Sequence, residues 1–322
     1  MDQSSLPLES LRYAAGGLDR ASSLRTDSDW VRQQLEHEAS LVVPVFGAHS
    51  LFAVDALDQT FTGAILPLAG EIRTSLPPAG EVVLLGLRES IAIFAVELSA
   101  DASTDITRQF GGQFEDLRLA GACLPGPDAA LLAYGRGLLH WHRTHQYCGS
   151  CGAQMDSAHG GHMRRCPTCA RETFPRIDSA VIMLVETTNE TGEPICLLGR
   201  HARLPTGIFS TLAGFVETGE SLEETVVREG MEESGVKVDR VDYRGSQPWP
   251  FPASLMLGFR AWATTTDISA HDDELEAVAW FTAEELSDFG EWSDEAAEFR
   301  LPRRDSIARV LIDEWLAEHR TG

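Results

Sequence analysis

The chain has 322 residues, of which 43% are hydrophobic and 23% charged, so it has the composition of a globular protein and the length of two domains. Its 49 acidic residues outnumber its 26 basic ones, and the net charge of −23 disfavours broad, nonspecific affinity for nucleic acid. No apolar run approaches the roughly 18 residues of a membrane span, so we expect no membrane contact.

The N-terminal sequence, MDQSSLPLES, is polar and acidic and is unlike a secretory signal or a transit peptide, which leads us to expect a cytoplasmic protein. Residues 1–140 predict a β-rich domain, because short apolar runs alternate with Gly, Pro and Asp turns. The expected strands are Leu41–Phe46 and residues 51–54, 82–87 and 91–98, with breakers at residues 76–80 and 124–128. No residue in this domain indicates chemistry, and we expect it to serve structure or subunit contact.

Residues 129–145 predict a helix, capped by Asp128, that leads towards the first cysteine pair. His140, His142 and His145 lie near its end. Because the first two point to different sides of a helix, a shared metal site is unfavourable. Four cysteines nearby already complete a tetrahedral site, so we expect the histidines to be structural.

Two CxxC pairs follow, separated by fourteen residues, and each can form a tight turn that directs two thiolates at one ion. The predicted ligands of this zinc ribbon are Cys148, Cys151, Cys166 and Cys169. With all four positions filled by protein, the zinc is expected to be structural. Arg164, Arg165 and Arg171 leave nucleic-acid binding as an alternative, although the net charge favours a folding role. The lone Cys123 and Cys196 are expected to be buried.

Three short strands are predicted after the ribbon. Residues 179–185 (SAVIMLV) form the continuous apolar run of a buried strand, and residues 195–200 (ICLLGR) predict its hairpin partner. Residues 209–212 predict a strand that feeds directly into a turn at Gly214.

Residues 214–236, GFVETGESLEETVVREGMEESGV, predict a glycine-rich turn and a helix. Ser221 and Glu224 are expected to form a capping box at the start of the helix, and Gly235 a left-handed cap at its end.

Three carboxylates of this helix, those of Glu229, Glu232 and Glu233, are expected to project from one face. Like charges placed in this way repel one another. A divalent cation such as Mg²⁺ or Mn²⁺, with oxygen ligands here and substrate phosphates opposite, would remove the repulsion. The alternative is a solvated acidic face, which is the usual outcome for a Glu-rich helix.

Residues 246–254, SQPWPFPAS, carry three prolines at alternate positions and predict a stiff extended loop, not a helix or a central strand. The loop would hold Trp249 and Phe251 in orientations suited to packing against flat groups. The alternative is that both rings anchor the loop in the core.

The spacing of Gly214, Glu220, Arg228 and the three helix carboxylates resembles the Nudix box, GX5EX7REUXEEXGU. One position departs: Gly230 stands where a bulky aliphatic residue is usual, at an expected cost of roughly 1 kcal/mol of helix stability. Residues 246–254 resemble SQPWPFPxS, the signature of the NADH pyrophosphatase subfamily of Nudix hydrolases, at all eight specified positions. A WHxxHxxC lead-in at residues 141–148 and the zinc ribbon also match.

The resemblance implies an α+β fold. Residues 174–322 would form the Nudix domain, a mixed β-sheet flanked by helices. The β-rich domain of residues 1–140 and a Cys₄ zinc ribbon in residues 141–173 would precede it.

The resemblance also implies roles for the acidic residues. Glu229, Glu232 and Glu233 would bind the catalytic Mg²⁺ or Mn²⁺. Glu220 and Arg228 would brace the loop and the helix. Glu274 falls where the family has a further acidic residue that binds metal or acts as a base.

Five residues would bind the substrate. Phe215 and Phe174 would stack on its bases, Phe174 replacing a tyrosine that is common in the family and lacking its hydroxyl. Gln247 and Ala308 match positions that line the pocket, and Trp249 of the signature completes the set.

The implied reaction is hydrolysis of the pyrophosphate bond of NADH or NAD⁺, giving nicotinamide mononucleotide and AMP by in-line attack of an activated water. Glu233 or Glu274 would be the general base. One alternative is another substrate, such as ADP-ribose, a diadenosine polyphosphate or the NAD cap of an RNA 5′ end. The other is a zinc-ribbon binding protein that only senses a nucleotide, which the intact acidic set disfavours. The family is typically homodimeric, and we expect a homodimer.

Overall fold

The structure is a computed structural model that describes residues 11–14, 16–54, 61–68, 72, 82–269 and 275–320. The chain forms two compact units. The N-terminal unit comprises residues 12–177 and 249–253, and the C-terminal unit comprises Leu11 with residues 178–248 and 254–320. Within the described ranges, no helix has both the length and the apolar character needed to cross a membrane.

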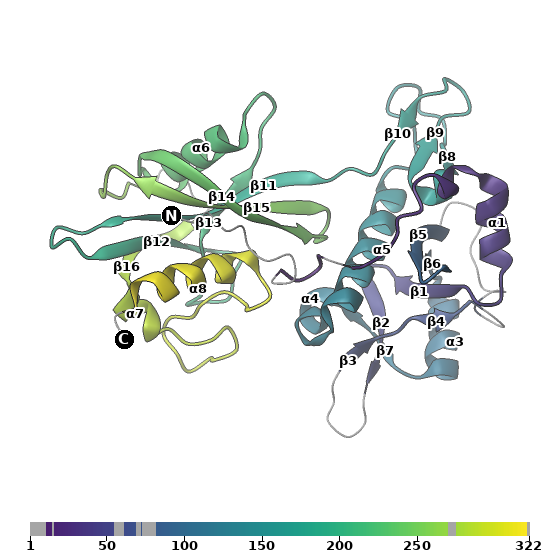
Figure 1. Cartoon of the computed structure of the whole chain (residues 1–322), viewed down its shortest axis with the longest axis horizontal. Coiled ribbons are helices and arrows are strands. Elements are labelled where there is room, and N and C mark those ends of the chain that lie inside the picture. Colours follow the sequence, from purple (N-terminus) through teal and green to yellow (C-terminus); the bar gives the residue numbers. More distant parts are fainter. Residues whose placement is uncertain are drawn as a thin grey trace. The chain divides into compact units, whose positions relative to one another are not determined.

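The N-terminal unit is built on a seven-stranded sheet of order β3-β2-β1-β6-β5, in which β4 pairs with β1 and β7 with β2 (Figure 1). The strands are β1 (Leu41–Phe46), β2 (His49–Val54), β3 (Phe61–Gly63), β4 (Leu66–Pro67), β5 (Val82–Arg88), β6 (Ile91–Glu97) and β7 (Gln113–Asp116). The helices are α1 (Ser28–Glu36), α3 (Ala100–Phe110), α4 (Leu117–Ala120) and α5 (Gly126–Thr144), with 3₁₀ turns η2 (Leu24–Thr26) and η3 (Gly121–Cys123).

Alternate residues of this sheet enter two separate cores. Val43 and Val45 pack in the core that includes α5, whereas Val42 and Phe94 pack in the core that includes α3. Because both faces are covered, the central strands are continuous apolar runs. The predicted strands at residues 41–46, 82–87 and 91–98 are therefore confirmed to within one residue at each end.

The ribbon in the same unit is a three-stranded sheet of order β10-β9-β8. Its elements are β8 (Asp156–Ala158), the 3₁₀ turn η4 (His159–Gly161), β9 (Met163–Arg165) and β10 (Glu172–Thr173).

The C-terminal unit has a sheet of order β14-β15-β11-β12-β16, in which β13 also pairs with β11. The strands are β11 (Asp178–Thr188), β12 (Pro194–His201), β13 (Leu212–Phe215), β14 (Val238–Trp249), β15 (Ser254–Ala263) and β16 (Leu275–Thr282). The helices are α6 (Leu222–Ser234), α7 (Ala283–Ser287) and α8 (Ile307–His319). Helices α6 and α8 cover opposite faces of the sheet, since Val181 and Met183 of β11 pack with α6 and Ile182 and Leu184 pack with α8 (Figure 1).

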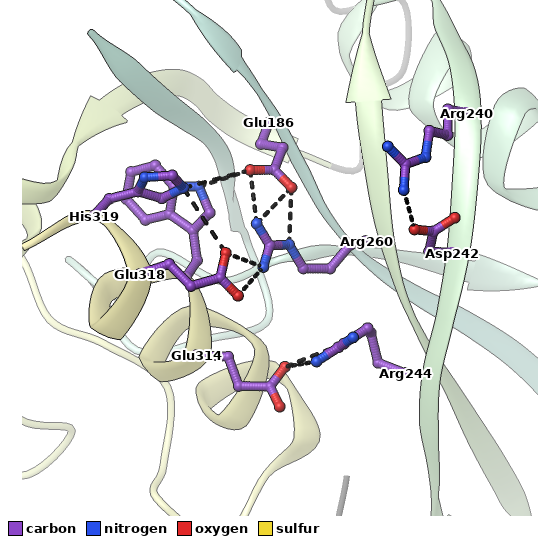
Figure 2. A network of polar contacts seen from close by, with 9 residues as sticks. Glu186, Arg240, Asp242, Arg244, Arg260, Glu314, Glu318 and His319 are labelled. Carbon is purple, nitrogen blue, oxygen red and sulfur yellow. Dashed lines mark hydrogen bonds and ion pairs between the residues drawn. The ribbon is translucent and has the colours of Figure 1, made fainter. Parts of the chain in front are cut away.

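A buried ion pair fastens the end of α8 to this sheet (Figure 2). Arg260 of β15 donates to both carboxylate oxygens of Glu186 of β11, at 2.8 and 2.7 Å, and to Glu318 of α8 at 2.8 Å. The indole Nε1 of Trp315 donates to Glu186 at 3.1 Å.

Three predicted elements needed correction. The strand expected at residues 209–212 is β13, Leu212–Phe215, because these later residues pair with β11, and Gly214 therefore lies inside a strand and not in a turn. Helix α5 begins at Gly126, so Asp128 lies in its first turn, where a negative charge is favourable, and does not cap it. Ser246–Trp249 do not belong to a loop: they end β14, where Pro248 is tolerated because β14 is an edge strand.

Of the two lone cysteines, Cys196 is buried as predicted, whereas Cys123 is exposed. It ends the turn η3, and its neighbour Leu124 takes the core position instead. The breaker expected at residues 76–80 lies outside the described residues.

Candidate functional site

Helix α6 carries the acidic residues, and its two ends are fixed by the predicted caps. Ser221 Oγ accepts from the amide of Glu224 at 3.2 Å, and the Glu224 carboxylate accepts from the amide of Ser221 at 2.8 Å. Gly235 ends the helix with a φ of 72°, in the left-handed region. A Cβ there would also lie 2.7 Å from the carbonyl oxygen of Ser269, so both the conformation and the space require glycine.

Arg228 lies at the centre of the acidic cluster. Its Nε donates to Glu220 at 2.6 Å, and its Nη1 donates to Glu229 at 2.9 Å and to Glu232 at 2.8 Å. Its Nη2 donates to the carbonyl oxygen of Phe215 at 2.8 Å. One guanidinium thus joins the turn, β13 and α6, and it offsets part of the repulsion among the carboxylates.

Glu220 is committed to this framework as an acceptor. Its carboxylate also accepts from the Thr225 hydroxyl at 3.0 Å and from the amide of Glu217 at 3.1 Å. The hydrogen bond from Arg228 lowers the pKa of Glu220 to about 2, and the hydrogen bonds to Glu220 and then to the other carboxylates raise the pKa of Arg228. The sequence prediction missed Thr225, because a threonine in the first turns of a helix is too common to signal a role.

Gly214 of β13 lets the strand and the helix meet. A Cβ at this position would lie 1.8 Å from the carboxylate carbon of Glu229. Gly214, the first glycine of the motif, is therefore needed because the Glu229 side chain comes so close to it, and not because it forms a turn.

The carboxylates of α6 differ in burial. The side chain of Glu229 is 13% exposed and that of Glu232 is 52% exposed, while Glu233 is buried. Their oxygens are the ligand type that Mg²⁺ and Mn²⁺ prefer, and the donor set fits such an ion. Among the described residues, the four ribbon cysteines are the only group of three or more His, Cys, Asp or Glu whose ligand atoms all lie within 4.8 Å of one another. Arg228 bonds the carboxylates of Glu229 and Glu232 in this structure. Glu274 lies outside the described residues.

The residues predicted to bind substrate are distributed over both units. Phe215 of the C-terminal unit is 59% exposed, and Phe174 of the N-terminal unit is 61% exposed, so each presents a ring to solvent. Gln247 and Ala308 are buried in the C-terminal unit. Trp249 belongs to the N-terminal unit and packs against its core, as the alternative for this ring anticipated.

The ribbon cysteines form a site whose dimensions suit zinc. Their Sγ atoms lie 3.6 Å apart between Cys148 and Cys169, 3.4 Å between Cys151 and Cys166, and 3.7 Å between Cys151 and Cys169. A tetrahedron with Zn–S bonds of about 2.3 Å has edges of roughly 3.8 Å, close to these distances.

The closeness of the four sulfurs and the amides around them shift the pKa values of the thiols in opposite directions. The backbone amides of Ser150 and Cys151 lower the pKa of Cys148 to about 6. For Cys151, the Ala153 amide lowers the pKa, but hydrogen bonds with the other sulfurs and burial outweigh it and raise the pKa to about 12. All four sulfurs would be thiolates only with a cation between them, and the residues fit a four-cysteine zinc site.

His142 connects the ribbon to α5. Its Nε2 donates to the carbonyl oxygen of Gly161 at 2.7 Å, and its Nδ1 accepts from Nε of Arg164 at 3.2 Å. Arg164 also donates to the carbonyl oxygen of Met155 at 2.9 Å. Burial lowers the pKa of His142 to about 4, so it is a neutral structural histidine, as predicted. The sequence did not indicate that Arg164 is buried as its partner.

Three families match successive parts of the chain. Residues 35–141 match the family described as NADH pyrophosphatase-like rudimentary NUDIX domain. Residues 143–174 match the NADH pyrophosphatase zinc ribbon domain, and residues 177–301 match the NUDIX domain.

Curated relatives are similar over most of their length. The NAD-capped RNA hydrolase NudC of Mycobacterium bovis is 37% identical over 309 residues, which cover 94% of this chain and 93% of the relative. The protein of the same name from Deinococcus radiodurans is 37% identical over 254 residues, 79% of this chain and 84% of the relative. Human NAD-capped RNA hydrolase NUDT12 is 30% identical over 335 residues, 93% of this chain and 72% of the relative.

Proposed function

Given that this chain belongs to the NudC-type NADH pyrophosphatase family of Nudix hydrolases, we propose that it hydrolyses the pyrophosphate bond of NADH or NAD⁺. The products are nicotinamide mononucleotide, reduced or oxidised, and AMP. The observation that carries the proposal is the acidic face of α6. Arg228 donates to its carboxylates, and the Glu229 carboxylate lies directly over Gly214. The same chain has the zinc ribbon and the SQPWPFPAS signature.

The residues of α6 divide into two roles. Glu229, Glu232 and Glu233 would hold Mg²⁺ or Mn²⁺, which when bound neutralises the charge of the pyrophosphate and activates water for attack. Glu220 and Arg228 fix the turn against α6, since Arg228 on the helix donates to Glu220 and to the carbonyl oxygen of Phe215.

The remaining residues handle the proton and the substrate. Glu233 or Glu274 accepts the proton of the attacking water. Phe215 and Phe174, which expose their rings, are our candidates for stacking on the bases of the substrate. Gln247 and Ala308, both buried, would support the binding site from within the C-terminal unit. Trp249 packs on the core of the N-terminal unit and would act by positioning its neighbours.

The test is a product analysis of zinc-loaded protein incubated with NADH and either Mg²⁺ or Mn²⁺. We expect reduced nicotinamide mononucleotide and AMP in equal amounts, separated by chromatography. If no nicotinamide dinucleotide is cleaved with either ion, the proposal fails. Parallel reactions with NAD⁺ and ADP-ribose determine whether the nicotinamide half is required.

A second candidate substrate is the NAD cap of an RNA 5′ end, because the relatives of this chain are named NAD-capped RNA hydrolases. The net charge of −23 disfavours strong binding of the RNA body, and Arg165 lies directly opposite the acidic Asp156 and Glu172 on the neighbouring strands of the ribbon sheet. We therefore expect similar kcat/KM values for NAD⁺ and a short NAD-capped RNA, with weak salt dependence. A capped RNA cleaved far faster, with a steep loss on adding salt, would indicate dedicated RNA contacts.

We further propose that the protein works as a cytoplasmic homodimer with one structural zinc ion in each ribbon. The molar mass in solution, measured by light scattering, tests the dimer.

A further inference from the structure

We propose that Tyr13 and Arg136 are positioning residues that hold residues Trp249–Ala253, and thereby help to place the substrate-binding residues beside them. This segment, called the signature loop below, comprises the last residue of β14 and the turn that follows it. This gives Tyr13 and Arg136 an indirect effect on substrate binding, through the chain that joins Trp249 to Gln247. The consequence for binding rests on the proposed function, whereas the anchoring of the loop does not.

The loop belongs to the N-terminal unit, although the residues on both sides of it belong to the C-terminal unit. Within the N-terminal unit, Trp249 and Phe251 pack against the buried core that contains Tyr13, Leu131 and Leu138. Their rings are therefore partly buried among the residues of the N-terminal unit.

Three aromatic rings form a closed set of contacts. The ring centroids lie 5.9 Å apart for Tyr13 and Trp249, 5.6 Å for Tyr13 and Phe251, and 5.1 Å for Trp249 and Phe251. All three pairs meet edge to face, with interplanar angles of 72°, 78° and 78°. Edge-to-face pairs at such distances are favourable beyond the area that they bury. Tyr13 is only 3% exposed, and its ring contacts both rings of the loop.

A buried cation, Arg136, lies over the ring of Phe251. The Cζ atom of Arg136 is 4.9 Å from the Phe251 ring centroid, and Arg136 is only 6% exposed. Its Nε donates to the carbonyl oxygen of Ala48 at 3.1 Å, and no carboxylate of the described residues lies within 4.0 Å of its nitrogens. The face of the aromatic ring therefore supplies part of the stabilisation that a buried guanidinium needs.

The residue two positions before Trp249 connects the loop to the predicted pocket. Gln247 is fully buried; its Nε2 donates to the carbonyl oxygen of Asp305 at 2.7 Å, and its Oε1 accepts from the amide of Ile307 at 2.8 Å. These bonds fix the first residues of α8 directly before Ala308. A shift of Trp249 would therefore displace Gln247, two positions earlier in the chain, and with it the start of α8.

The test compares Tyr13→Ala with the conservative Tyr13→Phe and with Phe94→Leu. Phe94 is an equally buried ring in the other core of the N-terminal unit, so its variant controls for lost stability. Two measurements are made on the full chain at a temperature where all variants are folded. They are hydrogen exchange of the peptide covering residues 247–256, and KM and kcat for NADH.

Tyr13→Ala is expected to speed exchange in this peptide and to raise KM about tenfold with a smaller change in kcat, because the binding residues are misplaced. Tyr13→Phe should restore both values, and Phe94→Leu should change neither. If the peptide covering residues 247–256 exchanges at the same rate in Tyr13→Ala and Phe94→Leu, Tyr13 does not hold the loop and the proposal fails. Faster exchange with an unchanged KM would overturn its link to substrate binding. If the wild type cleaves no NADH, the proposed function fails, and the exchange measurement still decides whether the loop is anchored.

Discussion

At the level of single residues, the acidic cluster depends on one arginine and one glycine. Arg228 donates to three carboxylates and a carbonyl oxygen, so each of its three nitrogens has a hydrogen-bond acceptor within the site. Only glycine fits at position 214, because the Glu229 carboxylate occupies the space where a Cβ would lie. The motif positions with no obvious chemistry are therefore explained by the geometry that they make possible.

Glu233→Gln should lower kcat for NADH by about 100-fold or more, because the amide neither binds a divalent cation as a carboxylate does nor accepts a proton. The near-isosteric change should leave the circular dichroism and the melting temperature close to wild type. Glu223→Gln is the matched control, since Glu223 is an exposed glutamate of the same helix. Turnover near the wild-type value in Glu233→Gln would remove this residue from the mechanism.

Gly230→Ala should stabilise the protein by roughly 0.5–1 kcal/mol, since alanine is the better helix former and glycine costs more chain entropy on folding. The added Cβ would meet Val238 Cγ2 at 3.5 Å and the Val236 carbonyl oxygen at 3.8 Å, which are ordinary contacts. NADH hydrolysis should not change. Gly235→Ala, at a φ of 72°, should instead destabilise. Denaturant unfolding of both variants measures the contrast, and a loss of stability in Gly230→Ala would contradict the prediction.

At the level of elements, helix α8 is tied to the C-terminal unit at both ends. Its start is held by Gln247 and by Arg309, which donates to Glu291 at 2.8 and 3.0 Å. Its end is held by the buried pair of Arg260 and Glu186. These polar attachments complement the apolar face of α8 and fix its position along the sheet.

Glu186→Gln should cost about 3 kcal/mol of unfolding free energy, because it removes the buried charge opposite the Arg260 guanidinium and leaves only the half-exposed Glu318 as its ionic partner. The control is Asp242→Asn, which breaks an ion pair with the exposed Arg240 on the edge strand β14 (Figure 2). Such a surface pair contributes about 1 kcal/mol or less. Equal losses in the two variants, measured by denaturant unfolding, would show that burial does not control the strength of these pairs.

The Glu291 carboxylate gives the attachment of α8 a pH dependence. Hydrogen bonds from Arg309 lower the pKa of Glu291 from its ordinary value of 4.5 to about 2. Since the unfolded chain takes up the proton first as the pH falls, the stability that this carboxylate contributes is complete above about pH 5 and is lost towards about pH 2. Wild type should therefore be more stable than Glu291→Gln at neutral pH, and the difference should shrink below about pH 4. A difference that does not depend on pH would refute this linkage.

At the level of the whole molecule, the chain forms two units whose membership does not follow sequence order. Residues 249–253 belong to the N-terminal unit, between two strands of the C-terminal unit. The N-terminal unit also contains the zinc ribbon, which His142 and Arg164 connect to the long helix α5. Changes in the ribbon should therefore affect the stability of the N-terminal unit.

Cys166→Ser should abolish stoichiometric zinc binding and lower the melting temperature, because the free energy of metal binding contributes directly to the folding of such sites. Cys123→Ser is the control, since Cys123 lies outside the four-cysteine group. Metal analysis should find about one zinc per chain in the control and much less in Cys166→Ser. A full zinc content in Cys166→Ser would rule out the four-cysteine site.

Local patterns determined much of the site before any fold was known. The capping box of Ser221 and Glu224, the left-handed Gly235 and the four-cysteine group depend on residues close in sequence, or on two short motifs, and all three are found as predicted. The hairpin of β11 and β12 was also predictable, because its strands are buried runs joined by a short turn.

The errors occurred where distant residues determine the structure. The bounds of β13 depend on pairing with β11, and the strand conformation of Ser246–Trp249 depends on the edge position of β14. Neither pairing is encoded within the segment itself, since register and strand order arise from contacts far apart in sequence.

The sequence by itself determined the chemistry of this protein: which side chains can hold cations, how they are spaced on a helix, and which family they resemble. Only the tertiary structure decided what surrounds them. It placed the Glu229 carboxylate over Gly214, buried both ends of the Gln247 amide at the start of α8, and packed Trp249 and Phe251 with Tyr13. The physical reason is that helix caps and ligand spacing depend on local geometry, whereas burial and close approach depend on how complementary surfaces pack across the fold.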